Sequence, residues 1–239
     1  MHPHRPQRKG RGTLENPPNR FERIAYEPDP DVLNDPDERP NPRTLLLRDP
    51  SRSILSHNES PDVGFSTSVN PYRGCEHGCT YCYARPTHEW LGFSAGLDFE
   101  TKILVKEHAP QLLRATLASP RWQPQVVALS GVTDPYQPIE RKLLLTRGCI
   151  EVLTEFRNPV AIVTKNALVA RDVDLFVQLA QVQAVAIIVS ITTLDPQLAH
   201  RMEPRASAPQ KRLDAIRTLA RAGVPVGVNV APIIPGLTD

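Results

Sequence analysis

The sequence predicts an α/β fold in which parallel strands alternate with helices. Four short apolar runs, at residues 126–129, 160–163, 184–189 and 226–230, are typical of parallel strands buried on both faces. A first strand is expected near Thr67, where the pattern becomes regular. The repeated strand–helix alternation favours right-handed crossovers, in an open sheet or in part of a barrel.

Helical patterns lie between these strands. Residues 172–179 place apolar side chains on one face, and 142–156 are expected to form another helix. The best-marked helix has Ser207 as its N-cap and Pro209 in its first turn, and Gly223 ends it. A helix followed by glycine and then by a strand is a step typical of α/β proteins.

Residues 1–63 differ from the rest of the chain. They contain no long apolar periodic segment, and prolines interrupt an acidic run at residues 27–31. We therefore expect a largely irregular, solvated, Pro-rich N-terminal arm at residues 1–63, followed by a folded core at residues 64–239. The net charge of +2 does not by itself indicate a nucleic-acid partner, and the basic residues of 1–12 add only weak evidence for one.

The sequence shows no sign of a membrane segment or a secretory signal. No stretch approaches the roughly 18 uninterrupted apolar residues of a membrane span, and residues 1–12 have no apolar region behind them. We expect a cytoplasmic, reducing environment, in which the four cysteines are ligands or catalysts rather than disulfides.

Three cysteines lie close together in the segment 72–83. Cys75, Cys79 and Cys82 have the spacing C-x3-C-x2-C, and soft thiolate ligands select iron–sulfur clusters, zinc or copper(I). Three cysteines on a cluster of four irons leave one iron free to bind a small molecule. The alternatives are a structural zinc site completed by His77 or His88, and a disulfide. The tight spacing favours the cluster.

This motif, with an aromatic residue before the third cysteine, resembles the signature of the radical S-adenosylmethionine (SAM) superfamily. The sequence outside this motif is similar to that of the spore photoproduct lyase-related, DNA repair photolyase-like branch of the superfamily. The segments that carry this second resemblance lie at residues 70–74, 131–140, 164–166, 203–205 and 231–236.

The resemblance implies a partial (β/α)6 barrel that is cut short after the fifth strand, with a 4Fe–4S cluster on Cys75, Cys79 and Cys82 and SAM across the barrel mouth. We expect either a truncated chain or a partner over the open side. The implied cofactor-binding residues are Tyr81 for the adenine, Ser130, Thr133 and Asp134 for the methionine amino group, Lys165 for its carboxylate, Ser190 and Thr192 for the ribose, Arg205, and Ile234 on the adenine side.

Simpler roles are open for several of these residues. The three residues after the second strand also fit a polar Asp-Pro turn, and Lys165 also fits a solvated lysine. Arg205 and Arg212 are expected on a surface helix or loop, and only Arg205 is retained as a candidate. Glu140 is as well suited to capping the next helix as to acting as a base.

The resemblance also implies a reaction. The reduced cluster cleaves SAM to methionine and a 5′-deoxyadenosyl radical, which abstracts hydrogen from the substrate. A flavodoxin- or ferredoxin-type one-electron reductant is the expected partner. Spore photoproduct lyases are expected to have a further cysteine, a hydrogen donor, near the end of the second strand, but residues 126–140 contain none. Cys149 is expected to be a core residue.

The substrate is therefore open, with a nucleic-acid lesion as one candidate. Two other functions compete with this reading. One is a zinc-stabilised nucleic-acid-binding module that uses the three cysteines and His88. The other is an iron–sulfur protein that does not cleave SAM.

Overall fold

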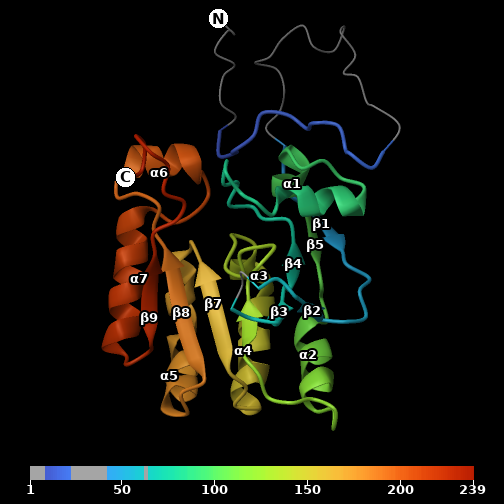
Figure 1. Cartoon of the computed structure of the whole chain (residues 1–239), viewed down its shortest axis with the longest axis vertical. Coiled ribbons are helices and arrows are strands. Elements are labelled where there is room, and N and C mark those ends of the chain that lie inside the picture. The colour runs from blue at the N-terminus through green and yellow to red at the C-terminus, as the bar shows by residue number, and fades with distance from the viewer. Residues whose placement is uncertain (1–8, 23–41, 62–63) are drawn as a thin grey trace, which may run out of the picture.

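The computed structural model describes residues 9–22, 42–61 and 64–239 (Figure 1). Its main feature is a six-stranded sheet with the order β2-β3-β6-β7-β8-β9. Five of these strands are parallel, and β2 joins the edge of the sheet antiparallel to β3. The strands are β2 Leu55–His57, β3 Thr67–Val69, β6 Val127–Leu129, β7 Val160–Thr164, β8 Val185–Ser190 and β9 Val226–Asn229. All five strands expected from the sequence are confirmed.

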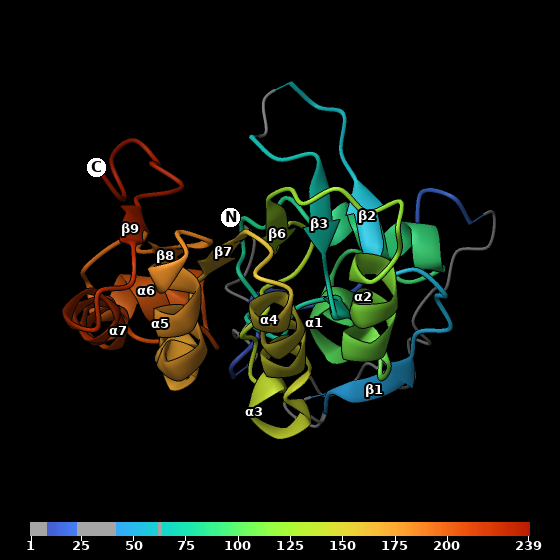
Figure 2. The same ribbon diagram turned by 90° about the horizontal axis from the view of Figure 1, so that it is seen from below.

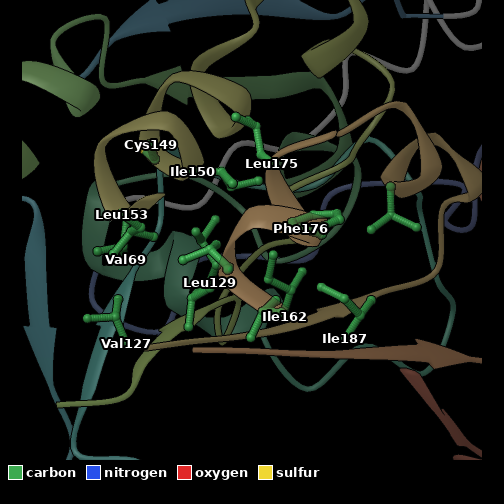
Figure 3. Packing of buried hydrophobic residues seen from close by; sticks show 14 of the residues in the cluster. Val69, Val127, Leu129, Cys149, Ile150, Leu153, Ile162, Leu175, Phe176 and Ile187 are labelled. Atoms are coloured by element: carbon green, nitrogen blue, oxygen red, sulfur yellow. The ribbon is translucent and has the colours of Figure 1, made fainter. Parts of the chain in front are cut away.

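Helices cover one face of this sheet (Figure 2). The covering helices are α2 Ala109–Leu117, α4 Leu145–Glu155, α5 Val173–Gln181 and α7 Pro209–Arg221. Alternate strand residues such as Leu129 and Ile162 face these helices and pack with Ile150 and Phe176 in one buried core (Figure 3). Each such fully buried side chain contributes roughly 1.5–3 kcal/mol.

A small second sheet lies beside the first. It has the order β1-β5-β4, from β1 Leu45–Arg48, β5 Lys102–Val105 and β4 Tyr72–Arg73. The 3₁₀ helix η2 Arg85–Leu91 and the short helix α1 Leu97–Thr101 lie between β4 and β5 in the chain.

The predicted, largely irregular arm contains two short strands where the structure describes it. Residues 45–48 and 55–57 form β1 and β2, which pair with β5 and β3. Strands of three or four residues are too short to produce a clear periodic pattern, so partners distant in sequence decide their structure. The acidic run at residues 27–31 lies outside the described residues. The domain boundary between residues 63 and 64 stays a prediction.

Two helix predictions are corrected. The helix expected at 142–156 is divided into α3 Glu140–Leu143 and α4, because Leu144 adopts a φ of 55°. Ala208, not Ser207, is the N-cap of α7. The Ser207 hydroxyl instead accepts a hydrogen bond from the Ala167 amide, at 2.9 Å. The remaining elements are η3 Ala167–Asp172 and α6 Pro196–Met202.

None of the helices within the described ranges has both the length and the apolar character that a bilayer-spanning segment requires.

Candidate cofactor site

A cavity of about 390 Å³ opens at the carboxyl ends of the parallel strands, between those ends and the cysteine loop. This edge is where α/β proteins gather their ligand-binding side chains. Six of the nine predicted cofactor-binding residues line the cavity together with the three predicted metal ligands. The six cofactor-binding residues are Tyr81, Ser130, Thr133, Asp134, Lys165 and Ser190, and the three metal ligands are Cys75, Cys79 and Cys82.

The cysteine loop follows β4. Gly74 and Gly78 turn it with φ values of +82° and +67°, which non-glycine residues rarely adopt. All three cysteines are free thiols; Cys75 and Cys79 are each only 7% exposed, and Cys82 is half-buried. The disulfide alternative therefore finds no support in the structure.

Gln137 holds this loop against the end of β6. Its side-chain amide donates to the Gly74 carbonyl at 3.2 Å and accepts from the Glu76 amide at 3.0 Å. The Thr133 hydroxyl also donates to the Gly74 carbonyl, at 2.7 Å. The segment 131–140 thus positions the cysteines, a role that the sequence analysis did not assign to Gln137.

The donor set fits an iron–sulfur cluster. Burial raises the pKa of the Cys79 thiol well above its usual value, and the Glu203 carboxylate and Cys75 raise this pKa further. A thiolate is therefore costly here unless a cationic centre binds it, and three thiolates facing one cavity are the ligands that such clusters use.

A single zinc ion fits less well. In the described part of the chain, no three or more His, Cys, Asp or Glu side chains are grouped so that they could hold one metal ion. His88 Nε2 lies 2.9 Å from the Lys102 carbonyl, and His77 Nδ1 lies 3.3 Å from Asp134. His77 lines the cavity, but its two ring nitrogens already contact Asp134 and Asn166, and His88 does not line the cavity. In a 4Fe–4S cluster each thiolate binds a different iron atom, so the three sulfur atoms need not be grouped around a single ion.

Asp134 connects the cysteine loop to the ends of two strands. Its carboxylate accepts hydrogen bonds from the Thr164 hydroxyl and the Lys165 amide, both at 2.7 Å, and it pairs with His77. Burial alone would raise the pKa of Asp134, but His77 and these hydrogen bonds lower it. Burial has the opposite effect on His77 and would lower its pKa, but Asp134 and Cys75 raise this pKa to about 10. Asp134 is therefore an ionised organiser of the site.

Glu203 is the main residue that the sequence analysis missed. Its buried carboxylate accepts hydrogen bonds from Tyr81 and from Thr192, the latter at 2.7 Å, and pairs with Lys165 at 3.3 Å and with Arg212. Burial would raise the pKa of Glu203, but Arg212 and Lys165 lower it to about 2. The segment 203–205 was a signal for this residue, but only Arg205 was considered.

Arg212 corrects a prediction, because it is buried rather than on the surface. It lies on the inner side of α7 and donates to the carbonyls of Ser190, at 2.9 Å, and Ser207, at 2.7 Å. Pairing with the Glu203 carboxylate compensates for its burial.

Three predicted cofactor residues do not line the cavity. Thr192 bonds to Glu203 and to the Ala231 carbonyl. Arg205 pairs with Glu76 at 3.1 Å, and the Ile234 amide donates to the Thr238 hydroxyl. Thr192 is one contact away from the cavity through Tyr81.

Glu140 and Cys149 have structural roles. Glu140 accepts from the Thr146 and Arg147 amides in the first turn of α4, as expected for a helix cap, and also from the Tyr72 hydroxyl at 2.5 Å. Cys149 is fully buried in the main core, which confirms it as a core residue (Figure 3).

Comparison with known proteins identifies the family. Residues 69–239 match the Radical SAM superfamily. An uncharacterised protein of Mycobacterium tuberculosis (strain ATCC 25618 / H37Rv) is 43% identical over 175 residues, which cover 73% of this chain and 52% of that protein. An uncharacterised protein of Methanocaldococcus jannaschii is 32% identical over 199 residues, covering 83% of this chain and 71% of that protein.

Solved structures agree in fold. A spore photoproduct lyase complexed with dinucleoside spore photoproduct matches with a TM-score of 0.55 at 21% identity, over 80% of this chain and 52% of that one. The match over residues 69–239 shows that the chain belongs to the radical SAM superfamily. The chain spans about half the length of the mycobacterial relative.

Proposed function

We propose that this chain is the catalytic core of a radical SAM enzyme, with a 4Fe–4S cluster on Cys75, Cys79 and Cys82 and SAM in the adjoining cavity. When bound and reduced, these groups supply a 5′-deoxyadenosyl radical that abstracts hydrogen from a substrate. The observation that carries the proposal is that Cys75, Cys79 and Cys82, all free thiols, line one cavity with polar strand-end residues.

The protein's own residues bind and orient the cofactor. The Lys165 ammonium lines the cavity and lies 5.5 Å from the Tyr81 ring centre. A cation in the cavity wall is suited to binding the carboxylate of an amino-acid ligand. Ser130 and Ser190 offer hydroxyls at the ends of β6 and β8. The buried Glu203 fixes Lys165 and Tyr81 and so orients one wall of the cavity.

A nucleic-acid base is the substrate that we propose. Tyr83 lines the cavity but is 80% exposed, and its hydroxyl donates to the Gly131 carbonyl. A fixed, exposed aromatic ring beside a reactive cavity is a surface on which an unstacked base can rest. A spore photoproduct lyase of similar fold has a dinucleoside lesion bound, which supports this class of substrate.

The proposed reaction does not use a fourth cysteine as the hydrogen donor to the substrate. The sequence contains four cysteines in all, and the fourth, Cys149, is buried in the core on the helix side of the sheet. We therefore propose a lyase-like or isomerising reaction without a cysteine donor from these residues, with reducing equivalents from a flavodoxin- or ferredoxin-type protein.

Two measurements test the function. The anaerobically reconstituted, reduced protein should give an electron paramagnetic resonance (EPR) signal of a 4Fe–4S cluster, and adding SAM should change that signal. A signal that SAM leaves unchanged would favour the iron–sulfur protein that does not cleave SAM. Single-stranded and lesion-containing oligonucleotides then test the substrate: Tyr83→Ala should weaken their binding about 5- to 150-fold, from a stacking contribution of about 1–3 kcal/mol.

A further inference from the structure

Residues 9–22 lie against the cysteine loop and its supporting helices, although the sequence analysis placed them in a solvated arm. In Figure 1 this segment runs above α1. The Leu97 amide donates to the Glu15 carbonyl at 3.3 Å, and Asn16 and Asp98 exchange two hydrogen bonds at 2.8 and 2.9 Å. The segment is therefore fastened to α1.

Gly12 makes the closest approach to the loop. A Cβ atom added to Gly12 would lie 1.7 Å from the carbonyl oxygen of Gly78, the residue just before Cys79. Such a distance is far inside van der Waals contact, so only glycine permits this packing. The Gly12 amide also donates to Glu100 Oε2, at 2.9 Å.

Glu100 joins the two segments through its fully buried carboxylate. Oε1 accepts from the Thr13 hydroxyl at 3.0 Å and from Arg85 at 2.7 Å. The same Arg85 guanidinium donates to the Cys79 carbonyl, at 2.8 and 3.1 Å. The backbone of a predicted cluster ligand and the segment around Gly12 are thus held by one buried ion pair.

Arg11 adds a second buried cation at this junction. It donates to the Glu100 carbonyl at 2.9 Å and to the Pro42 carbonyl at 2.7 Å, and it is almost fully buried. Burying a guanidinium is costly unless its donors are satisfied. An arm that only touched the surface would not meet this cost.

We propose that residues 11–13 are positioning residues of the cluster site: through Glu100 and Arg85 they fix the Gly78–Cys79 backbone, and they cover the outside of the loop. The proposal rests on the assignment of Cys79 as a cluster ligand. Its consequence is that iron retention depends on a segment more than 60 residues before the first cysteine. Residues that orient metal ligands typically change metal affinity about 10- to 100-fold when they are altered.

The test compares Gly12→Ala with Gly64→Ala. A Cβ at Gly64 meets nothing within 4 Å, so the control makes the same chemical change in open space. After anaerobic reconstitution, iron is titrated away with a chelator. Gly12→Ala should lose its iron at an at least roughly tenfold lower chelator concentration, and Gly64→Ala should match the parent protein. Equal iron retention in both variants would overturn the proposal.

A second measurement does not need the cluster. Hydrogen–deuterium exchange of residues 74–83 in the iron-free protein should be faster in Gly12→Ala, and to a smaller degree in Thr13→Val, which removes only the hydroxyl bond to Glu100. If Gly12→Ala does not fold, Thr13→Val decides the question. Unchanged exchange in a folded variant contradicts the positioning role. Faster exchange in Gly12→Ala, together with a parent protein that never binds iron, would instead refute the cluster assignment alone.

Discussion

The His77 imidazole and the Asp134 carboxylate lie 3.3 Å apart and join the cysteine loop to the strand-end motif after β6. Asp134 also accepts hydrogen bonds from Thr164 and Lys165 at the end of β7. One carboxylate therefore sets the position of the loop relative to two strands. The walls of the cavity are thus connected through this carboxylate.

Replacing Asp134 with Asn should loosen this connection. An amide has one acceptor oxygen in place of two, so at least one buried donor is left without a partner at a cost of about 1–3 kcal/mol. Urea unfolding should show this loss of stability. Asp174→Asn, which alters an exposed ion pair with Arg147, serves as the control and should change stability by less than about 1 kcal/mol. Equal stability of the two variants would argue against the organising role.

Lys165→Gln should weaken SAM binding without loss of iron. A charge-assisted hydrogen bond is worth about 1.5–3 kcal/mol, which corresponds to roughly a 10- to 150-fold change in affinity. Equilibrium binding to the reconstituted protein measures the effect. Lys142→Gln, on the exposed side of α3, is the matched control. If Lys165→Gln binds SAM as tightly as the control does, Lys165 is only a partner of Glu203.

Glu203→Gln should destabilise the protein in a pH-dependent manner. The folded-state pKa of about 2 lies below the ordinary value of 4.5, so the carboxylate stabilises the fold above pH 4.5. That contribution, about 3 kcal/mol, is lost as the pH falls through the folded-state pKa. The stability difference between parent and variant should therefore be largest near pH 7 and shrink between pH 4.5 and 2.

The control for this prediction is Glu155→Gln, which breaks an exposed ion pair with Arg114. Because exposed pairs contribute little, this variant should lie within about 1 kcal/mol of the parent at every pH. A Glu203→Gln variant with the same flat profile would contradict the account of the buried carboxylate.

Cys149→Ala should lower the stability of the protein without lowering its iron content, unlike substitution of any of the three predicted ligands. Removing a fully buried sulfur from the core should cost about 0.5–3 kcal/mol of stability. Iron content after reconstitution should stay at the parental value. Iron analysis of Cys149→Ala beside Cys75→Ala checks this, and iron loss from both variants would mean that Cys149 belongs to the cluster site.

Much of the fold could be predicted from the sequence, because five strands and their helices have clear apolar patterns. The cysteine spacing likewise predicted one shared site for Cys75, Cys79 and Cys82; the three line one cavity, and their role as cluster ligands stays a prediction. Local chemistry was sufficient in these cases, since buried parallel strands and a short cysteine loop are specified by residues close in sequence.

Contacts between distant residues were not predictable in the same way. The Gly12–Gly78 approach and the Glu203–Lys165 pair join segments 66 and 38 residues apart, and no local pattern identifies such partners. Arg212 was expected at the surface because arginine is seldom buried without a partner. Its partner Glu203 could be recognised only once the chain had folded.

The most direct test is the release of 5′-deoxyadenosine. The protein is purified and reconstituted without oxygen, reduced, mixed with SAM and analysed by mass spectrometry, with Cys79→Ala and Cys149→Ala beside it. Our account predicts product that requires reductant and SAM, that is absent from Cys79→Ala and present in Cys149→Ala. A colourless protein with stoichiometric zinc, or an iron-loaded protein that releases no 5′-deoxyadenosine, would contradict it.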